Sequence, residues 1–492
     1  MASNTSKALK GISSQTVVTI LLGVLEVVSF SIMSRLLSKE DFGFYAAVNA
    51  IVIVFSSLSE TGIGSAIVQR KETTDRYINN AFTLSLLFGL ASMALLFFAA
   101  IILPESVISE QMRIPLMLMS VTLMLNCVTS IFRSILHKQL KFFTIGFVQL
   151  LSLVITTIVA VVLAIKGLGY YAIIAKAILG SALSFVIFFF LSKTRYKLMI
   201  DKDTFRDIFK FSGWLMASRF FSDLSKQIDK LLMPRIMSIA TLGAYTRPKD
   251  FIGTFSGKIN GIFDSALFPV LSSIQDNNKA LTSAYKKALY SLNMFSLLLT
   301  IAFAINSQLI MRIFFGKDWL YLAPVLAIFS VLFIFNADGR IADCYLRSLG
   351  KTKTQFYFRI IEFVTKTIGV VIGSKWGLMG VTIGVVLMEC IVKLIKVSYA
   401  GSLIKMPFRE ILQILIQSCY YSLIILPIMV LLYYLLPHTV TGEIVLLVSF
   451  TILVVILFLF FPRVIGKRYA EDLYPMVKGH INSLLKKAHL QK

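Results

Sequence analysis

Basic side chains recur at helical spacing inside one long apolar run of this sequence. Arg219, Asp223, Lys226 and Lys230 stand at positions i, i+4, i+7 and i+11 within the run 208–236. With 3.6 residues per turn, these four residues fall on one face of a helix. Ammonium and guanidinium groups in a row bind phosphate or carboxylate groups through charge-assisted hydrogen bonds. The chemistry expected is therefore recognition of an anion.

Further basic residues stand inside apolar runs, where a charge is expensive. A charged side chain at the centre of a bilayer costs about 2.5–3.5 kcal/mol on insertion scales, so such residues usually face a bundle interior or a watery cavity. The basic residues outnumber the acids near them, which indicates an anionic substrate. The predicted substrate-binding residues, which form a cationic cavity, are Arg219, Lys226, Lys230, Arg247, Lys249, Lys258, Lys176, Arg340 and Lys366.

The acidic residues within the runs have two interpretations. They either couple transport to protons or sodium ions, or they form ion pairs with basic neighbours. Arg219–Asp223 and Glu362–Lys366 are i, i+4 pairs, which lie close enough on a helix to neutralise each other. The residues with this double interpretation are Asp223, Asp264, Glu26 and Glu60.

The sequence offers no residue set for covalent catalysis or for a metal ion. It contains no catalytic triad, no nucleotide-binding loop and no metal-ligand cluster. Its four cysteines lie in apolar runs, which argues against a disulfide framework, and its four histidines are scattered. The net charge is +24, but no nucleic-acid motif accompanies it. We predict neither an enzyme, nor a cofactor, nor a nucleic-acid partner.

Membrane-spanning helices are the elements that must position these residues. Hydrophobic residues make up 57% of the 492-residue chain and charged residues 15%, against about 25% charged residues in soluble domains. A spanning helix needs about 20 apolar residues. We predict an all-α integral membrane protein with about 14 transmembrane helices. The apolar runs are 13–37, 41–69, 77–103, 111–136, 142–166, 168–194, 208–236, 240–274, 281–313, 318–349, 354–375, 377–402, 411–436 and 441–465.

The distribution of basic residues between the runs predicts the orientation. The start of the chain, every second connection and the basic tail at 466–492 hold most of the Lys and Arg outside the runs. Because positively charged loops stay in the cytoplasm, both termini are predicted to be cytoplasmic. The first run is longer than the apolar part of a signal peptide and lacks a small-residue cleavage site, so we expect an uncleaved first span.

Two segments match at an offset of 200 residues and indicate an internal repeat. Arg, Ser, Gly and Tyr coincide between 35–45 and 235–245. A repeat of six spans places both copies in the same orientation, related by an axis along the membrane normal. Gly43 and Gly243 are either hinges or sites of close helix packing. We predict an N-lobe at 1–200, a C-lobe at 201–403 and two extra C-terminal helices within 404–465, with the two parallel-repeat six-helix lobes around a central cavity.

Four segments resemble the polysaccharide transporter family, the Wzx-type flippase group of the multidrug/oligosaccharidyl-lipid/polysaccharide (MOP) superfamily, and within it the branch of colanic and teichuronic acid exporters. These segments are 34–45 (SRLLSKEDFGFY), 69–71 (QRK), 268–275 (FPVLSSIQ) and 314–319 (FFGKDW). The resemblance implies the MOP flippase fold. It also implies translocation of undecaprenyl-diphosphate-linked polysaccharide repeat units to the outer leaflet by alternating access. The location implied is the bacterial cytoplasmic (inner) membrane.

Two related functions stay open beside this one, an ion-coupled multidrug antiporter and a lipid II-type flippase. An antiporter for cationic drugs favours buried acids, whereas this interior is net basic. A membrane glycan polymerase or ligase typically needs a large outward loop, and the outward connections here are short. Besides the lipid-linked oligosaccharide, the predicted partners are membrane lipids, a polysaccharide polymerase and a chain-length regulator, and the protein is predicted to be a monomer.

Overall fold

The computed structural model describes residues 2–59, 63–69, 74–105, 108–192, 194, 196–274, 277–420, 422–436 and 439–460. Every regular element in these ranges is a helix. The first helices are α1 (Ala2–Leu36), α2 (Lys39–Ser59), α3 (Ile63–Gln69), α4 (Asp75–Ile102), α5 (Glu110–Lys138), α6 (Phe142–Ile165), α7 (Tyr170–Ser192), α8 (Lys202–Ile236) and α9 (Ile239–Ser273). The others are α10 (Asn278–Ile305), α11 (Ser307–Ile310), η1 (Met311–Phe315), η2 (Lys317–Leu322), α12 (Ala323–Ser330), α13 (Leu332–Ser348), α14 (Thr352–Gly373), η3 (Ser374–Trp376), α15 (Gly377–Leu403), α16 (Phe408–Ser418), α17 (Ser422–Leu435) and α18 (Val440–Phe460).

The helices have the length and composition of membrane spans. Within the described ranges, nine stretches are long and apolar enough to cross a membrane, and one of them, Lys353–Leu403, contains both α14 and α15. Most helix bounds lie within a few residues of the apolar runs in the sequence. The all-helical membrane fold predicted from the sequence is confirmed, and the total of fourteen spans stays a prediction.

Polar residues at the starts of α2 and α9 fix where these two helices begin. The Ser38 backbone N–H donates to Asp41 Oδ2 at 3.0 Å, and the Asp41 N–H donates back to Ser38 Oγ at 3.1 Å. At the start of α9, the Thr241 N–H donates to Ser238 Oγ, also at 3.1 Å. Such caps satisfy backbone donors that have no partner inside the helix. The two caps occupy equivalent positions in the predicted repeat.

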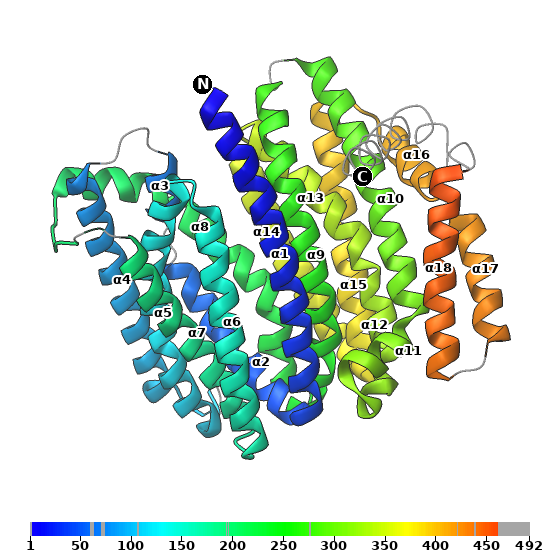
Figure 1. Cartoon of the computed structure of the whole chain (residues 1–492), viewed down its shortest axis with the longest axis horizontal. Coiled ribbons are helices and arrows are strands. Elements are labelled where there is room, and N and C mark those ends of the chain that lie inside the picture. The colour runs from blue at the N-terminus through cyan, green and yellow to red at the C-terminus, as the bar shows by residue number, and fades with distance from the viewer. Residues whose placement is uncertain are drawn as a thin grey trace, which may run out of the picture. The chain divides into compact units, whose positions relative to one another are not determined.

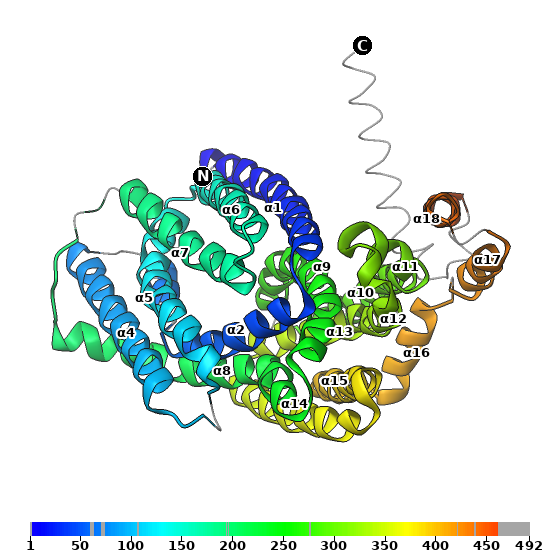
Figure 2. The same cartoon turned by 90° about the horizontal axis from the view of Figure 1, so that it is seen from below.

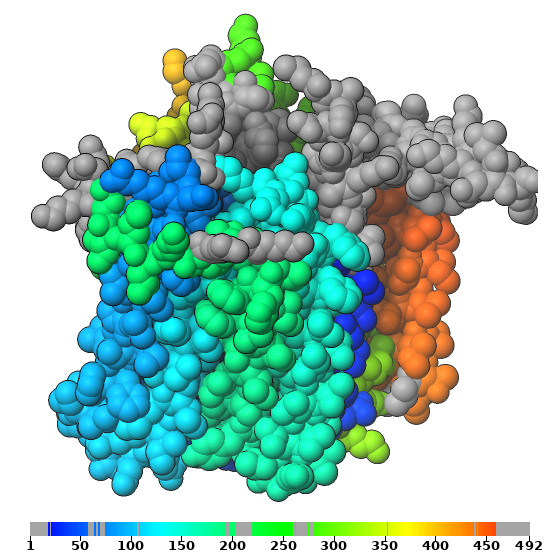
Figure 3. Space-filling model, turned by 60° about the vertical axis from the view of Figure 1, so that its left-hand side comes forward, coloured from blue at the N-terminus to red at the C-terminus, as the bar shows by residue number. Residues whose placement is uncertain are grey.

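The chain forms two compact units. Unit 1 comprises Met1–Arg247 and Arg359–Val381. In it α5 packs against α4 and α7, α6 packs against α1 and α7, and α2 packs against α5 and α8. These neighbours can be followed in Figure 1, and Figure 3 shows α6 and α7 side by side on one face. Unit 1 includes α8 and α14, which the sequence analysis assigns to the C-lobe, so the units do not follow the predicted lobe boundaries, and these stay a prediction.

Unit 2 comprises Pro248–Phe358 and Thr382–Lys492. Its core is built around α10, which packs against α12, α13, α16 and α17. Buried apolar residues from α10, α13, α16 and α17 and from α15 and α18, such as Tyr285, Tyr345 and Val397, form one cluster. The Tyr285 hydroxyl donates to the Val397 carbonyl at 3.1 Å, which satisfies a polar group inside this core.

The apolar run 411–436 does not form one span, and the prediction of a single helix there is wrong. It contains the end of α16 and all of α17, two helices separated at Cys419–Tyr420. Figure 2 shows α16 lengthwise where α17 and α18 are seen end-on, so α16 runs across their direction. Phe408, Leu412 and Ile416 are exposed along one edge of α16, whereas Ile411 and Ile414 are buried on the opposite side. The run is continuous in hydropathy because both the buried and the exposed edge of α16 are apolar.

Candidate functional site

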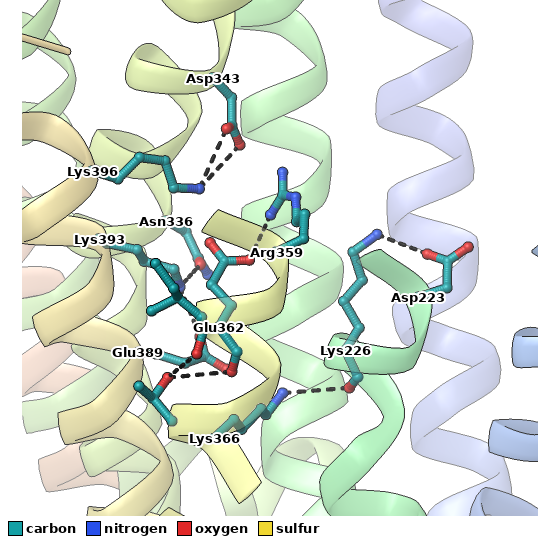
Figure 4. Close-up of polar contacts among 12 residues, drawn as sticks. Asp223, Lys226, Asn336, Asp343, Arg359, Glu362, Lys366, Glu389, Lys393 and Lys396 are labelled. Atoms are coloured by element: carbon teal, nitrogen blue, oxygen red, sulfur yellow. Dashed lines mark hydrogen bonds and ion pairs between the residues drawn. The ribbon is translucent and has the colours of Figure 1, made fainter. Parts of the chain in front are cut away.

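One carboxylate on α8 is shared by two predicted substrate-binding residues. The Arg219 Nε lies 4.0 Å from Asp223 Oδ2, and the Lys226 Nζ donates to Asp223 Oδ1 at 3.0 Å (Figure 4). The side chains of Arg219 and Lys226 are 51% and 62% exposed, whereas that of Asp223 is 15% exposed. The predicted Arg219–Asp223 pair is therefore confirmed. Two exposed cations and one carboxylate leave an excess of positive charge on this face of α8.

A second ion pair lies buried between α8 and α14 in unit 1. The Lys366 Nζ is 3.8 Å from Asp229 Oδ2, and these side chains are 6% and 0% exposed. The Tyr245 hydroxyl donates to the same carboxylate at 2.7 Å. Lys366 also donates to the backbone carbonyl of Lys226 at 3.4 Å (Figure 4). Lys366 thus joins two helices, which supports the structural interpretation for this predicted substrate-binding residue.

Arg247, at the start of α9, is enclosed by two aromatic rings. Its Cζ lies 3.4 Å from the ring centroid of Phe30 on α1 and 3.7 Å from that of Phe42 on α2. Its guanidinium also donates to the Phe30 carbonyl at 3.2 Å and to Ser34 Oγ. A planar guanidinium stacks on aromatic faces while its N–H groups donate hydrogen bonds. Arg247 is 9% exposed and, within unit 1, holds the first part of α9 against α1 and α2.

Lys176 of α7 makes a helix contact within the same unit. Its Nζ donates to Ser29 Oγ on α1, and the Thr157 hydroxyl of α6 donates to the same oxygen at 3.0 Å. Glu26 lies three residues before Ser29 and is half-buried. Lys176 therefore links α1, α6 and α7 through one serine hydroxyl.

Unit 2 contains a row of charges on α15 that the sequence analysis missed. The Lys396 Nζ lies 3.3 Å from Asp343 Oδ1, and the Lys393 Nζ donates to Glu389 Oε2 at 2.7 Å and to Asn336 Oδ1 at 2.5 Å (Figure 4). Glu389, Lys393 and Lys396 have i, i+4, i+7 spacing. The same spacing rule that selected the α8 stripe would have found them in the run 377–402.

Asp338 of α13 is a buried acid outside the predicted set. It is 1% exposed, and the Asn293 amide of α10 donates to its Oδ1 at 2.5 Å. Its Oδ2 has no hydrogen-bond partner among the described residues. A buried carboxylate oxygen without a donor is costly, so Asp338 joins the acids that are candidates for ion coupling.

The predicted site residues divide between the two units. Lys249, Lys258 and Arg340 are half-buried in unit 2. Glu60 and the side chain of Asp264 lie outside the described residues. Among those described, no three His, Cys, Asp or Glu residues are placed to hold a metal ion. Unit 1 contains Arg219, Asp223, Lys226, Lys230, Arg247, Lys176, Lys366 and Glu26.

The segment 196–201, here called the strap, connects α7 to α8 and is bound to α4. The backbone N–H groups of Lys197, Met199 and Asp201 donate to side-chain oxygens of α4 at 3.0, 2.9 and 2.7 Å. The acceptors are Asn79 Oδ1, Thr83 Oγ1 and Asn80 Oδ1, in that order.

An ion pair and a buried tyrosine complete the attachment of the strap. The Arg76 guanidinium lies 2.8 Å from Asp201 Oδ1. Tyr196 stacks on Phe82 of α4, and burial raises the pKa of its phenol, which therefore stays neutral. The connection between the two predicted lobes is thus fixed to the first of them.

Comparison with known proteins gives consistent matches over most of the chain. Residues 32–324 match the family model described as polysaccharide biosynthesis protein. The lipopolysaccharide biosynthesis protein WzxC of Escherichia coli (strain K12) is 22% identical over 392 residues, which cover 78% of this chain and 79% of WzxC. The teichuronic acid biosynthesis protein TuaB of Bacillus subtilis (strain 168) is 20% identical over 362 residues, 73% of this chain and 74% of TuaB.

A solved structure shares the fold. The inward closed conformation of the lipid II flippase MurJ superposes with a TM-score of 0.70 at 19% sequence identity, and the match covers 91% of this chain and 98% of MurJ. At 19% sequence identity, this structural similarity supports the fold alone. It confirms the MOP flippase fold predicted from the sequence.

Proposed function

Because the chain belongs to the polysaccharide biosynthesis protein family, we propose that this multi-pass membrane protein is a flippase for lipid-linked oligosaccharides. Its substrate is an undecaprenyl-diphosphate-linked polysaccharide repeat unit, moved from the cytoplasmic to the outer leaflet of the bacterial cytoplasmic membrane. The names of the relatives support this proposal, since WzxC and TuaB are biosynthesis proteins for bacterial surface polysaccharides and MurJ is a lipid II flippase.

The observation that carries the proposal is the excess of positive charge at Arg219 and Lys226. Both side chains are exposed, and they share the carboxylate of Asp223. A diphosphate presents several oxygens to a guanidinium and an ammonium group at once. Its binding would replace Asp223 as the partner of these cations. The buried cations Arg247 and Lys366, by contrast, hold helices together.

The proposed transport cycle is alternating access. The diphosphate binds at Arg219 and Lys226 from the cytoplasmic side, where both termini also lie. Lys249, Lys258 and Arg340 are the further predicted cations that would contact the anion in a later step of the cycle. The glycan then leaves on the outer side while the polyprenyl chain stays in the membrane. The protein acts as a monomer in this proposal. A polysaccharide polymerase and its chain-length regulator then receive the flipped repeat unit.

Export of surface polysaccharide in cells that lack their own flippase tests this function. Wild type, Arg219→Ala, Lys226→Ala and the double variant are compared at equal protein levels in the membrane. Loss of one cation is expected to lower export about tenfold and loss of both about a hundredfold, since each hydrogen bond to a charged group is worth about 1.5 kcal/mol or more, which is a factor of roughly ten. Lipid-linked repeat units then accumulate in the cytoplasmic leaflet, where a membrane-impermeant glycan reagent does not reach them in intact cells.

Lys166→Ala is the matched control. Lys166 is exposed at the end of α6, away from the α8 stripe, and its loss is expected to leave export unchanged. Normal export by the double variant would place the diphosphate elsewhere. Failure of wild type to export the repeat unit native to its own cells would reject the flippase function itself.

A further inference from the structure

Unit 1 contains a cavity of about 540 Å³ that the proposed substrate path does not use. It lies among α2, α4, α8 and the connection from α4 to α5. The volume is within the range of about 300–1,000 Å³ that is typical of small-molecule sites. Arg219 and Lys226 do not line it. The cavity is therefore distinct from the exposed pair Arg219 and Lys226, although Lys230 from the same face of α8 lines it.

The lining of the cavity is apolar along most of its surface. Ile51 and Phe55 of α2, Leu96 and Ala99 of α4 and Met112 of α5 all contribute to it. An aliphatic lining of this extent favours a hydrocarbon chain and disfavours a hydrated ion.

Three charged residues are among those that line the cavity, and two of them are basic. Lys230 is 8% exposed, whereas Arg235, five residues later on α8, is exposed. Glu105, also exposed, is the acidic residue among the described lining residues. Two cations against one carboxylate favour an anionic group next to the apolar chamber.

We propose that this cavity binds an amphiphile with a hydrocarbon chain and an anionic phosphate head. The chain lies against Ile51, Leu96 and Met112, and the head binds Lys230 and Arg235. A membrane phospholipid and a polyprenyl phosphate both have this chemistry. In either case the ligand would brace α8, which carries the exposed cations, against α2 and α4.

Binding to the purified full-length protein, delipidated in detergent, tests the proposal. Native mass spectrometry measures the retention of four probes, which are phosphatidylglycerol, undecaprenyl phosphate, zwitterionic phosphatidylcholine and inorganic phosphate. Phosphatidylglycerol or undecaprenyl phosphate is expected to bind at least about tenfold more tightly than the other two, because each of those lacks either the net charge or the chain. The ratio of the affinities for phosphatidylglycerol and undecaprenyl phosphate shows which of the two, a membrane phospholipid or a polyprenyl phosphate, the cavity prefers.

Variants at one apolar and one basic lining residue locate the binding. Ala99→Phe fills the apolar chamber, and Arg235→Gln removes an exposed charge without disturbing the core. Each is expected to weaken anionic-lipid binding about tenfold. The matched controls are Ala91→Phe, exposed on the same helix outside the cavity, and Lys166→Gln.

Three results would overturn the proposal. They are equal binding of phosphatidylcholine, equal binding of inorganic phosphate, and unchanged affinity in Arg235→Gln. Because Arg235 is exposed, the Arg235→Gln variant is expected to fold, so its affinity still tests the proposal if Ala99→Phe does not fold.

Discussion

Gly43 of α2 and Gly243 of α9 lie against each other, backbone to backbone. A Cβ added at Gly43 would lie 1.9 Å from the carbonyl oxygen of Ile239, and one added at Gly243 would lie 1.9 Å from that of Lys39. Each would also lie 2.9 Å from the backbone nitrogen of the other glycine. The two glycines occupy equivalent positions in the predicted repeat, and so do the two carbonyls. The two glycines therefore make equivalent contacts, whereas the repeat axis itself stays a prediction.

Replacing either glycine is expected to destabilise the protein. Gly43→Ala or Gly243→Ala forces two helix backbones apart, and overpacking of this kind costs about 1–3 kcal/mol. Thermal unfolding in detergent measures the effect. Gly253→Ala on α9 is the control, because a Cβ there meets nothing within 4 Å and alanine favours a helix by about 1 kcal/mol. Equal melting temperatures for Gly43→Ala and Gly253→Ala would mean that α2 and α9 do not pack this closely.

The buried pair of Asp229 and Lys366 is expected to matter for stability more than for substrate binding. Lys366→Met leaves the Asp229 carboxylate buried without the ammonium group. The Tyr245 hydroxyl and the Lys230 backbone N–H still donate to this carboxylate. Removal of one partner from a buried pair costs about 3–5 kcal/mol. The double variant Asp229→Asn with Lys366→Met removes both charges and is expected to recover most of that loss. The melting temperatures of the single and double variants check this cycle.

A different outcome would show that Lys366 binds substrate, as the sequence predicts. If Lys366→Met keeps its melting temperature but loses export, the ammonium acts on substrate. Lys226→Met shows what that result looks like for a substrate contact. This lysine is exposed and its pairing with Asp223 is worth about 1 kcal/mol or less, so the variant is expected to keep its melting temperature and lose export.

Much of the fold was predictable from the sequence because many of the long helices, such as α4, α5, α6 and α7, each coincide with one apolar run between polar connections. Sequence spacing correctly predicts neighbours on the same helix, since the i, i+4 rule places Arg219 beside Asp223 on α8. The spacing of residues along the sequence predicts which face of its own helix a residue occupies. It does not predict which other helix packs against that face. The contact of Lys366 with Asp229 and the stacking of Arg247 on Phe30 and Phe42 depend on tertiary packing.

The break between α16 and α17 was missed for a related reason. Hydropathy averages over both edges of a helix, and α16 is apolar on its buried edge, at Ile411 and Ile414, and on part of its exposed edge. The charges of α15 are a different case. Glu389, Lys393 and Lys396 have helical spacing in the sequence itself. They could have been predicted from that spacing alone, without any knowledge of the tertiary structure.

Arg247 is expected to be replaceable by neither lysine nor alanine, although lysine keeps the charge. An ammonium does not stack flat between Phe30 and Phe42 and does not reproduce the guanidinium hydrogen bonds, so Arg247→Lys is expected to cost about 1–2 kcal/mol. Thermal unfolding gives this loss. Arg219→Lys is the control, because Arg219 is exposed and a lysine there still binds a phosphate. Arg247→Lys with normal stability and impaired export would make Arg247 a substrate contact instead.

The strap is expected to stay bound to α4 through its three backbone hydrogen bonds. Asn80→Ala removes the acceptor of the Asp201 N–H, and a partly buried donor without a partner costs about 1–3 kcal/mol. Hydrogen–deuterium exchange at Asp201 is expected to accelerate about tenfold or more, since local opening becomes easier by that free energy. Ser92→Ala on the same helix is the control, because Ser92 does not contact the strap in any described hydrogen bond. Unchanged exchange at Asp201 in Asn80→Ala would show that the Arg76–Asp201 ion pair alone holds this end of the strap.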